Sequence, residues 1–191
     1  MNNIFKEDVL NVIKDSEDYS EIKNICNDIE YSNFTKCVFT DIEFTNMNLN
    51  HVTFRNCDFS NTTFEKMGMH NVVFENCKFV GAQFMMMPLN NGEFKDCLLS
   101  YSSFFEVKIK KTSFRNCKMI LARLNMVKFN SVNLENCDLA QTEIFNSPLK
   151  NIDLSSCNLD NLNIDIKDLR GSKLSSLQML QVASLLDIEI V

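Results

Sequence analysis

Glycine and proline are scarce in this chain, with four and two among 191 residues, so the sequence predicts no long flexible linker and favours one domain. No stretch approaches the roughly 18–20 consecutive apolar residues that a membrane-spanning helix requires. The first eight residues lack the basic segment followed by an apolar segment that marks a secretory signal. We therefore expect a cytoplasmic protein, in which cysteines are normally free thiols.

A strong positive charge is also absent. The formal net charge is −6, and residues 1–30, with eight acidic and three basic side chains, contribute −5 of it. Residues 31–174 hold sixteen basic and fifteen acidic side chains and are close to neutral. The acidity thus belongs mainly to the N-terminal segment, and the overall balance disfavours nucleic acid as a partner.

What the sequence does contain is a repeat. From Phe34 to Leu174 every fifth residue is Phe, Leu, Ile or Met, which gives 29 consecutive positions without an insertion. Thirteen of the sixteen phenylalanines lie on these positions. Long fixed periods are the signature of repeat architectures. A second period, of twenty residues, is marked by seven cysteines: Cys37, Cys57, Cys77, Cys97, Cys117, Cys137 and Cys157.

A period of five fits neither the 3.6-residue helix nor the two-residue strand. It does fit a coil whose twenty-residue turn has four five-residue sides. The large residue at the centre of each side would point inward, as would the smaller residue two positions before it, while the other three are mostly polar and would point outward. Turns stacked at the strand spacing of about 4.8 Å would give about seven coils and a rod of roughly 35 Å.

This pattern resembles the pentapeptide repeat family, whose consensus is Ala-(Asp/Asn)-Leu-X-X. Residues 57–61 (Cys-Asp-Phe-Ser-Asn) and 137–141 (Cys-Asp-Leu-Ala-Gln) are clear copies, and the resemblance covers residues 32–174. It implies an all-β solenoid, a right-handed quadrilateral parallel β-helix. It implies no single activity, since some relatives bind DNA gyrase and protect it from quinolones or peptide toxins and most have no known function.

A solenoid has two open ends, so we expect short helical caps on the β-helix of residues 31–174. The capping box of Ser175 and Gln178 predicts a helix to about residue 186, followed by a short strand over 188–191. Residues 175–191 would then be a cap or a dimerisation element. Lys167 occupies an inward position and indicates that the core ends near it.

The other cap is predicted in residues 1–30, an acidic helical segment. Apolar residues with helical spacing favour a helix over residues 4–16: Ile4, Phe5, Val9, Leu10 and Ile13.

The cysteine column has a functional and a structural interpretation. Zinc needs four ligands in a tetrahedron, whereas one inward thiol per coil forms a line. Parallel Cβ vectors about 4.8 Å apart also exceed the usual Cβ separation of a disulfide, about 3.5–4.5 Å. We therefore expect the seven cysteines to form a core ladder of small, buried, free thiols.

Few residues are candidates for catalysis. The two histidines, His51 and His70, occupy outward positions with no nucleophile placed beside them. A glycine-rich phosphate loop, paired catalytic carboxylates and a His–Glu metal motif are absent from the sequence. We expect no enzymatic activity, no catalytic or metal-binding residues and no cofactor.

Charged residues follow the repeat as well. One outward column contains both signs, and its oppositely charged neighbours are expected to compensate each other: Arg55, Glu75, Lys95, Arg115 and Glu135. A row of cations can contact phosphates, but little aromatic surface is interleaved with the basic cluster here, so we do not expect nucleic acid binding. The basic cluster comprises Lys108, Lys110, Lys111, Lys128 and Lys150.

Large apolar residues occupy outward positions in the middle of the expected rod, on two adjoining sides and their shared corner. Such a patch exceeds what a monomer usually exposes. The sequence leaves three covers open: the N-terminal segment of the same chain, a second copy, or another protein. We call these residues the lateral patch: Val80, Met85, Met86, Leu98, Tyr101, Phe105, Ile120, Leu121, Met126 and Phe145.

The sequence therefore predicts a non-enzymatic protein-interaction scaffold built on a rigid rod, with another protein or a second copy as its partner. A homodimer would form through residues 175–191 or through the lateral patch. The alternative is a DNA-mimicking protein that binds DNA gyrase or topoisomerase and protects it from inhibitors. Such a protein should present a continuous acidic face, and the repeat sequence offers none.

Overall fold

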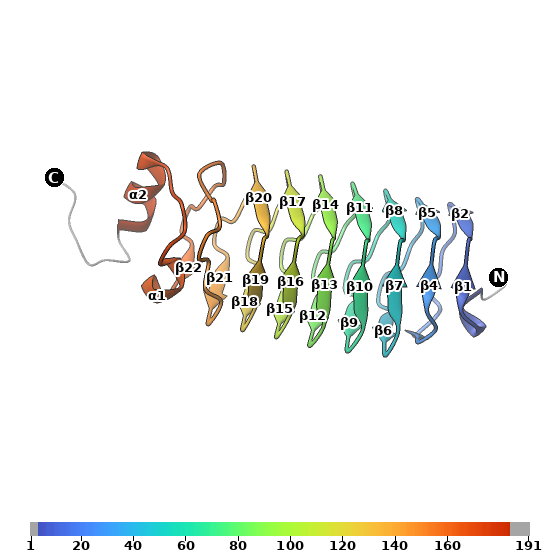
Figure 1. Ribbon diagram of the computed structural model, residues 1–191. Coiled ribbons are helices and arrows are strands. Elements are labelled where there is room, and N and C mark those ends of the chain that lie inside the picture. Colours follow the sequence, from blue (N-terminus) through green and yellow to red (C-terminus); the bar gives the residue numbers. More distant parts are fainter. Residues whose placement is uncertain (1–3, 184–191) are drawn as a thin grey trace.

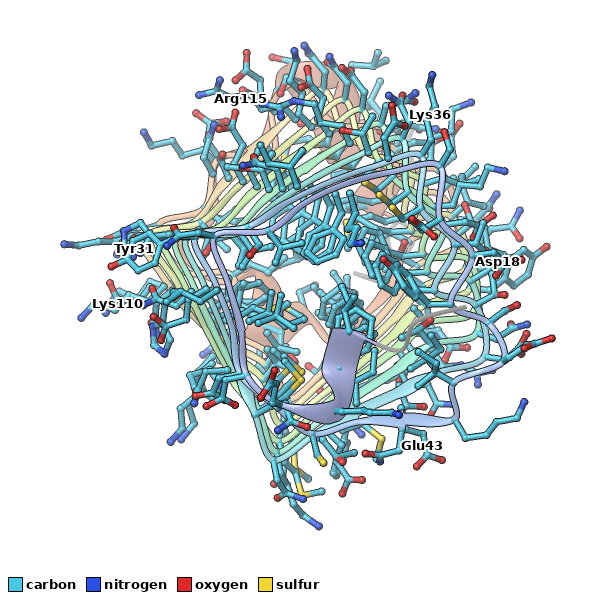
Figure 2. All side chains as sticks on the ribbon, turned by 90° about the vertical axis from the view of Figure 1, so that its right-hand side faces the viewer. Asp18, Tyr31, Lys36, Glu43, Lys110 and Arg115 are labelled. Atoms are coloured by element: carbon cyan, nitrogen blue, oxygen red, sulfur yellow. The ribbon has the colours of Figure 1, made fainter. Side chains whose placement is uncertain are left out.

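The computed structural model describes residues 4–183, which form one elongated coil (Figure 1). The strand pairs are parallel and join residues about twenty positions apart, as Phe74 pairs with Phe54. Three sides of the coil carry continuous ladders, and the fourth carries a row of isolated bridges from Asp18 to Asn158. Seen from its N-terminal end, the rod has four sides (Figure 2). The predicted four-sided parallel solenoid is confirmed.

We name the sides face A to face D in chain order, and the isolated bridges form face C. Face A contains β1 (Val9–Leu10), β4 (Ile29–Glu30), β7 (Asn48–Asn50), β10 (Gly68–His70), β13 (Pro88–Asn90), β16 (Lys108–Lys110) and β19 (Lys128–Asn130). Face B contains β2 (Ile13–Asp15), β5 (Asn33–Thr35), β8 (Thr53–Arg55), β11 (Val73–Glu75), β14 (Glu93–Lys95), β17 (Ser113–Arg115) and β20 (Asn133–Glu135). Face D contains β3 (Asn24–Ile25), β6 (Glu43–Thr45), β9 (Thr63–Glu65), β12 (Gln83–Met85), β15 (Ser103–Phe105), β18 (Arg123–Asn125), β21 (Glu143–Phe145) and β22 (Asn163–Ile164).

The core is a set of columns, because equivalent positions of successive coils lie above one another. On face B the ring centroids of Phe54 and Phe74 are 5.1 Å apart, and those of Phe74 and Phe94 are 4.8 Å apart. Rings of adjoining faces meet edge to face, as Phe74 and Phe79 do at 5.0 Å. Both geometries are favourable for aromatic rings. The predicted inward position of the centre residues is confirmed for these phenylalanines.

The corners explain the recurring asparagines. The residue two positions after the centre has a left-handed backbone at most corners, with φ of 55° at Asn56 and 53° at Asn76. Asparagine tolerates this conformation better than most residues other than glycine. Within residues 4–183, twelve of the 27 non-glycine residues with positive φ are asparagine, which makes it the most frequent residue at these corners.

The cysteine ladder fills the inner corner that leads into face C. All seven thiols are free and buried, as predicted, whereas Cys26 lies outside the ladder and is exposed. The Cys77 Sγ is 3.4 Å from the Phe54 carbonyl oxygen of the preceding coil. A hydrogen bond with the Cys117 thiol and, after it, burial raise the pKa of Cys137 to about 12, although contact with Cys157 acts in the opposite direction.

The prediction of an acidic helical cap over residues 1–30, with a helix over 4–16, was wrong. In the described part of this segment only Ile4–Lys6 forms a helical turn, η1, and the coil already begins at β1. The rod therefore has about eight turns instead of the predicted seven. Phe5 covers the open end of the core, with its ring centroid 5.0 Å from that of Tyr19.

Two departures from the period hid these first coils. A centre position is occupied by Lys14, which pairs in register with Phe34 and is only half-buried. The next centres, Tyr19, Ile25 and Ile29, are six and four residues apart instead of five. The two spacings sum to ten, so the chain regains register within one turn.

The C-terminal capping box is confirmed at the start of α2 (Ser176–Val182). The Gln178 backbone N–H donates to Ser175 Oγ at 3.3 Å, and the Ser175 N–H donates to Gln178 Oε1 at 2.8 Å. The Gln178 side-chain amide also donates to the Leu154 and Cys157 carbonyls, which fixes α2 on the end of the rod. The predicted helix end near residue 186 and the strand over 188–191 lie outside the described residues.

The inward position predicted for Lys167 is wrong, and the core continues to Leu169 and Val182. The short helix α1 (Ile166–Leu169) replaces one side of the coil, and its Lys167 is exposed and pairs with Asp165 at 3.0 Å. None of the helices within residues 4–183 is both long and apolar enough to cross a membrane.

The stacked core predicts a large loss of stability when one mid-rod ring is removed. Phe74→Ala should lower the free energy of unfolding by about 3–5 kcal/mol, because it leaves a cavity among four neighbouring rings. Phe145→Ala, at a position 39% exposed, is the control and should cost less than about 1 kcal/mol. Urea unfolding measures both, and equal losses would contradict the buried-column structure.

The thiol ladder predicts that stability falls at alkaline pH. An unfolded thiol ionises near pH 8.5, whereas contact with neighbouring thiols and burial raise the pKa of Cys37 and Cys137 in the fold. At a pH between the unfolded-state pKa and the folded-state pKa of a thiol, the folded state retains a proton that the unfolded state releases. The neutral thiols therefore make their whole contribution to the free energy of unfolding below pH 8.5. Above that pH the free energy of unfolding falls, by up to about 1.4 kcal/mol per pH unit for each such thiol.

Urea unfolding at pH 7, 8.5 and 9.5 measures this decline. Cys137→Ala removes one thiol and fills the same corner with a small apolar side chain, so its decline should be shallower than that of the unmodified chain. A profile that stays flat to pH 9.5 would show that the thiols are not held neutral by the fold.

Candidate interaction surface

The lateral patch follows both borders of face D. One apolar column lies at the corner between faces C and D, with Leu98 beside it on face C: Val80, Tyr101, Ile120 and Leu121. The other lies at the corner between faces D and A: Met85, Met86, Phe105, Met126 and Phe145. Because face D separates the two columns, the patch is a pair of parallel ridges.

Half of the patch residues are clearly exposed. The exposed fractions are 37% for Met86, 63% for Tyr101, 38% for Leu121, 45% for Met126 and 39% for Phe145. The other five are half-buried, since each lies in a column between side chains of neighbouring coils, as Met85 lies opposite Phe105 in β15. All ten side chains therefore lie outside the core, as the sequence predicted.

A shallow groove lies beside the first ridge on face D. It has a volume of about 240 Å³, and Tyr101 and Leu121 are among its lining residues. Arg123 and Glu143 also line it, with Arg123 Nε 3.1 Å from Glu143 Oε2. The groove thus combines apolar side chains with an exposed ion pair, a composition typical of protein contact surfaces.

The backbone under the exposed ridges is unfavourable for the residues that it carries. Met86, Tyr101, Leu121 and Met126 have φ values of 51°, 62°, 58° and 57°. A left-handed conformation costs roughly 1–2 kcal/mol for an ordinary L-residue. Asparagine, which tolerates it better, occupies the same two corners at Asn46, Asn61, Asn146 and Asn161. These four large residues therefore carry two costs, a left-handed backbone conformation and an apolar surface exposed to solvent.

One of the three covers considered for the patch is ruled out by the fold. The N-terminal segment from Ile4 to Glu30 forms the first coils of the rod, so it does not fold back over the middle. A second apolar surface lies at the C-terminal end of the rod, on α2. The exposed fractions there are 68% for Leu177, 49% for Met179 and 55% for Leu180. A second copy and another protein remain as partners for either surface.

The charge column predicted to compensate itself does so on face B. Glu75 pairs with Arg55 at 3.3 Å and with Lys95 at 2.9 Å, and Arg115 pairs with Glu135 at 3.4 Å. Figure 2 shows Arg115 pointing outward from its face. Pairs this exposed contribute little to stability.

The basic cluster is divided by the fold. Lys108, Lys128 and Lys150 line a cleft of about 710 Å³ on face A, whereas Lys110 and Lys111 lie outside it. Lys110 points away from the rod in Figure 2. The sequence identified these five lysines but could not indicate which of them share a hollow.

The two histidines take part in surface contacts. The His51 ring stacks on Tyr31 with centroids 5.0 Å apart, and His70 Nδ1 lies 3.3 Å from Asn90 Nδ2. Within residues 4–183 no three His, Cys, Asp or Glu side chains are grouped closely enough to hold a metal ion.

Comparison with solved structures shows the same fold. The chain is similar to a trypsin-treated form of QnrB1, a plasmid-mediated fluoroquinolone resistance protein, with 20% identity and a TM-score of 0.61 over 96% of this chain and 99% of that one. It is also similar to HetL, a pentapeptide repeat protein involved in heterocyst differentiation regulation from the cyanobacterium Nostoc sp. strain PCC 7120. That match has 11% identity and a TM-score of 0.60 over 89% and 84% of the two chains.

At the sequence level no curated protein matches. A family model, the pentapeptide repeat region, matches residues 27–104, 48–119 and 87–164. Together these overlapping segments cover residues 27–164, well over half of the chain. Sequence period, four-sided coil and family match agree, and the chain belongs to the pentapeptide repeat family.

Proposed function

We propose that this protein is a non-enzymatic, cytoplasmic interaction scaffold whose lateral patch binds a partner protein. The observation that carries the proposal is the placement of Met86, Tyr101, Leu121 and Met126 on exposed, left-handed corners. Stability alone would favour asparagine there, so these residues are explained by a contact that buries them.

The shape of the surface supports a protein partner. Two apolar ridges flank a polar strip, so a partner can bury large side chains at the edges and pair its polar groups with Arg123 and Glu143. Buried aromatic and aliphatic anchors surrounded by polar contacts are the usual anatomy of such an interface. The stacked core makes the rod rigid, so little ordering is needed on this side of the contact.

A gyrase-directed, DNA-mimicking protein is the second candidate. It is favoured by the likeness in fold to QnrB1, a fluoroquinolone resistance protein, over nearly the whole of both chains. The charges favour it less, because the column on face B contains both signs and face A carries the basic cluster. A mimic of DNA should present negative charge where phosphates would lie.

Replacing the exposed ridge by asparagine should separate binding from stability. Tyr101→Asn with Leu121→Asn should keep the free energy of unfolding or raise it by up to about 1 kcal/mol per site, since asparagine tolerates the left-handed backbone. The same variant should lose the partner that the unmodified chain captures from extracts of its native host. Tyr31→Asn is the matched control, an exposed aromatic residue at a left-handed corner outside the patch.

Sedimentation of the purified chain identifies a second copy as the partner if a dimer forms and is lost in Tyr101→Asn/Leu121→Asn but not in Tyr31→Asn. A double variant that captures the same proteins as the unmodified chain would contradict a role of the patch in binding. A double variant with a lower free energy of unfolding would contradict the argument that these corners favour asparagine.

The gyrase candidate is tested directly. The purified protein should not relieve quinolone inhibition of DNA gyrase in a supercoiling assay at stoichiometric concentration. A protein known to protect gyrase serves as the positive control. Clear protection of gyrase from the quinolone by this chain would favour the gyrase-directed function over the general scaffold.

A further inference from the structure

The coil-to-coil ladder is interrupted on face A near the C-terminal end. β19 is the last strand of its sheet, although the chain makes another turn after it. One coil earlier the Lys111 N–H donates to the Asn130 carbonyl at 2.9 Å, but no equivalent bond joins Ser131 to Lys150. The backbone groups of β19 that should pair with the next coil therefore face an opening.

The interruption extends to face B but not to the other two faces. The Asn136 N–H leaves the ladder and donates to Ser156 Oγ at 3.0 Å. On face C the Leu139 N–H still donates to the Asn158 carbonyl at 2.9 Å, and on face D β21 stays paired with β22. Two neighbouring coils are thus joined along faces C and D and separated along faces A and B, which makes the opening a wedge.

The residues of the next turn explain why the wedge opens there. Pro148 has no N–H to offer the Val127 carbonyl. Proline alone is not sufficient, because β13 begins at Pro88 and remains in its ladder. The segment is also held from the far side, where Asp168 of α1 accepts the Ser147 N–H at 3.2 Å through Oδ2 and the Leu149 N–H at 2.7 Å through its carbonyl.

The opening is apolar inside and basic at its rim. The cleft of about 710 Å³ contains Val127 and the half-buried Phe129, and Lys108, Lys128 and Lys150 surround it with Glu106 as their acidic neighbour. Within the described residues none of these three lysines has an ion-pair partner within 4.0 Å, whereas Lys95 on face B does. A further hollow of about 320 Å³ adjoins it at Phe129 and Lys150. We call the two together the lysine cleft.

We propose that the lysine cleft binds an extended acidic peptide segment of a partner protein. The cleft lies apart from the Tyr101 and Leu121 ridge and shares Met126 with the lateral patch. Unpaired N–H and carbonyl groups at a strand edge accept an added strand through main-chain hydrogen bonds. Alternating side chains of an added strand point to opposite faces, so apolar residues can contact Phe129 while acidic residues contact the lysines. Three unpaired cations select a negatively charged segment.

A synthetic probe tests this site on the full chain. A fluorescein-labelled peptide of about ten residues that alternates glutamate and valine should bind in fluorescence anisotropy, and its glutamine-for-glutamate counterpart should not. Lys128→Ser with Lys150→Ser should weaken binding by about tenfold. Lys110→Ser with Lys111→Ser removes the same charge from the same face outside the cleft and should change the affinity by less than about twofold. The amide resonances of Phe129 and Ser131 should shift on binding.

Several outcomes would overturn the proposal. Equal losses of peptide affinity in the two double lysine variants would show diffuse electrostatic attraction. Undiminished binding of a peptide that is N-methylated at alternate amides would show that no strand is added. Tighter binding of a thymidine oligonucleotide would assign the lysines to nucleic acid. Higher peptide affinity after removal of residues 184–191 would identify that segment as the occupant. A dimer lost in Lys128→Ser/Lys150→Ser would identify a second copy. None of these results depends on the Tyr101→Asn/Leu121→Asn experiment, so the two proposals fail separately.

Discussion

The structure depends on the backbone ladder that joins each residue to the one about twenty positions later. The ladder requires each turn to have the same length, because the N–H groups of one coil must meet the carbonyls of the next. The turn with shifted spacing near the N-terminal end obeys this requirement, since the long step from Tyr19 to Ile25 is followed by a short step to Ile29. Equal turns place like residues above one another, and the phenylalanine and cysteine columns follow.

This constraint limits where the sequence can vary for function. Inward positions must fill a core one side chain wide, and left-handed corners favour asparagine. Only outward positions are free, and the departures at exposed corners are the informative ones. Tyr101 and Leu121 replace residues that the corner would favour, and both are open to a partner.

The two proposed sites arise from different features of the same rod. The lateral patch uses a regular part of the coil, where side chains vary and the backbone does not. The lysine cleft uses the place where the backbone itself departs from the ladder, between β19 and the turn that contains Pro148. A rigid rod that carries both could hold two protein segments at a fixed separation, on faces that meet at one corner.

The sequence by itself determined the four-sided coil from Phe34 onward, the buried free thiols, the capping box of Ser175 and the outward position of every patch residue. It could do so because a period repeated 29 times overrides the ambiguity of any single repeat. It failed over residues 4–30, since Lys14 and the shifted spacing break the five-residue pattern while the hydrogen bonds of the neighbouring coil still maintain the strand pairing.

Only the tertiary structure decided that the N-terminal segment belongs to the rod, that two ridges flank face D and that Lys128 and Lys150 share a cleft. Each of these depends on contacts between coils, which the pattern of a single repeat does not contain.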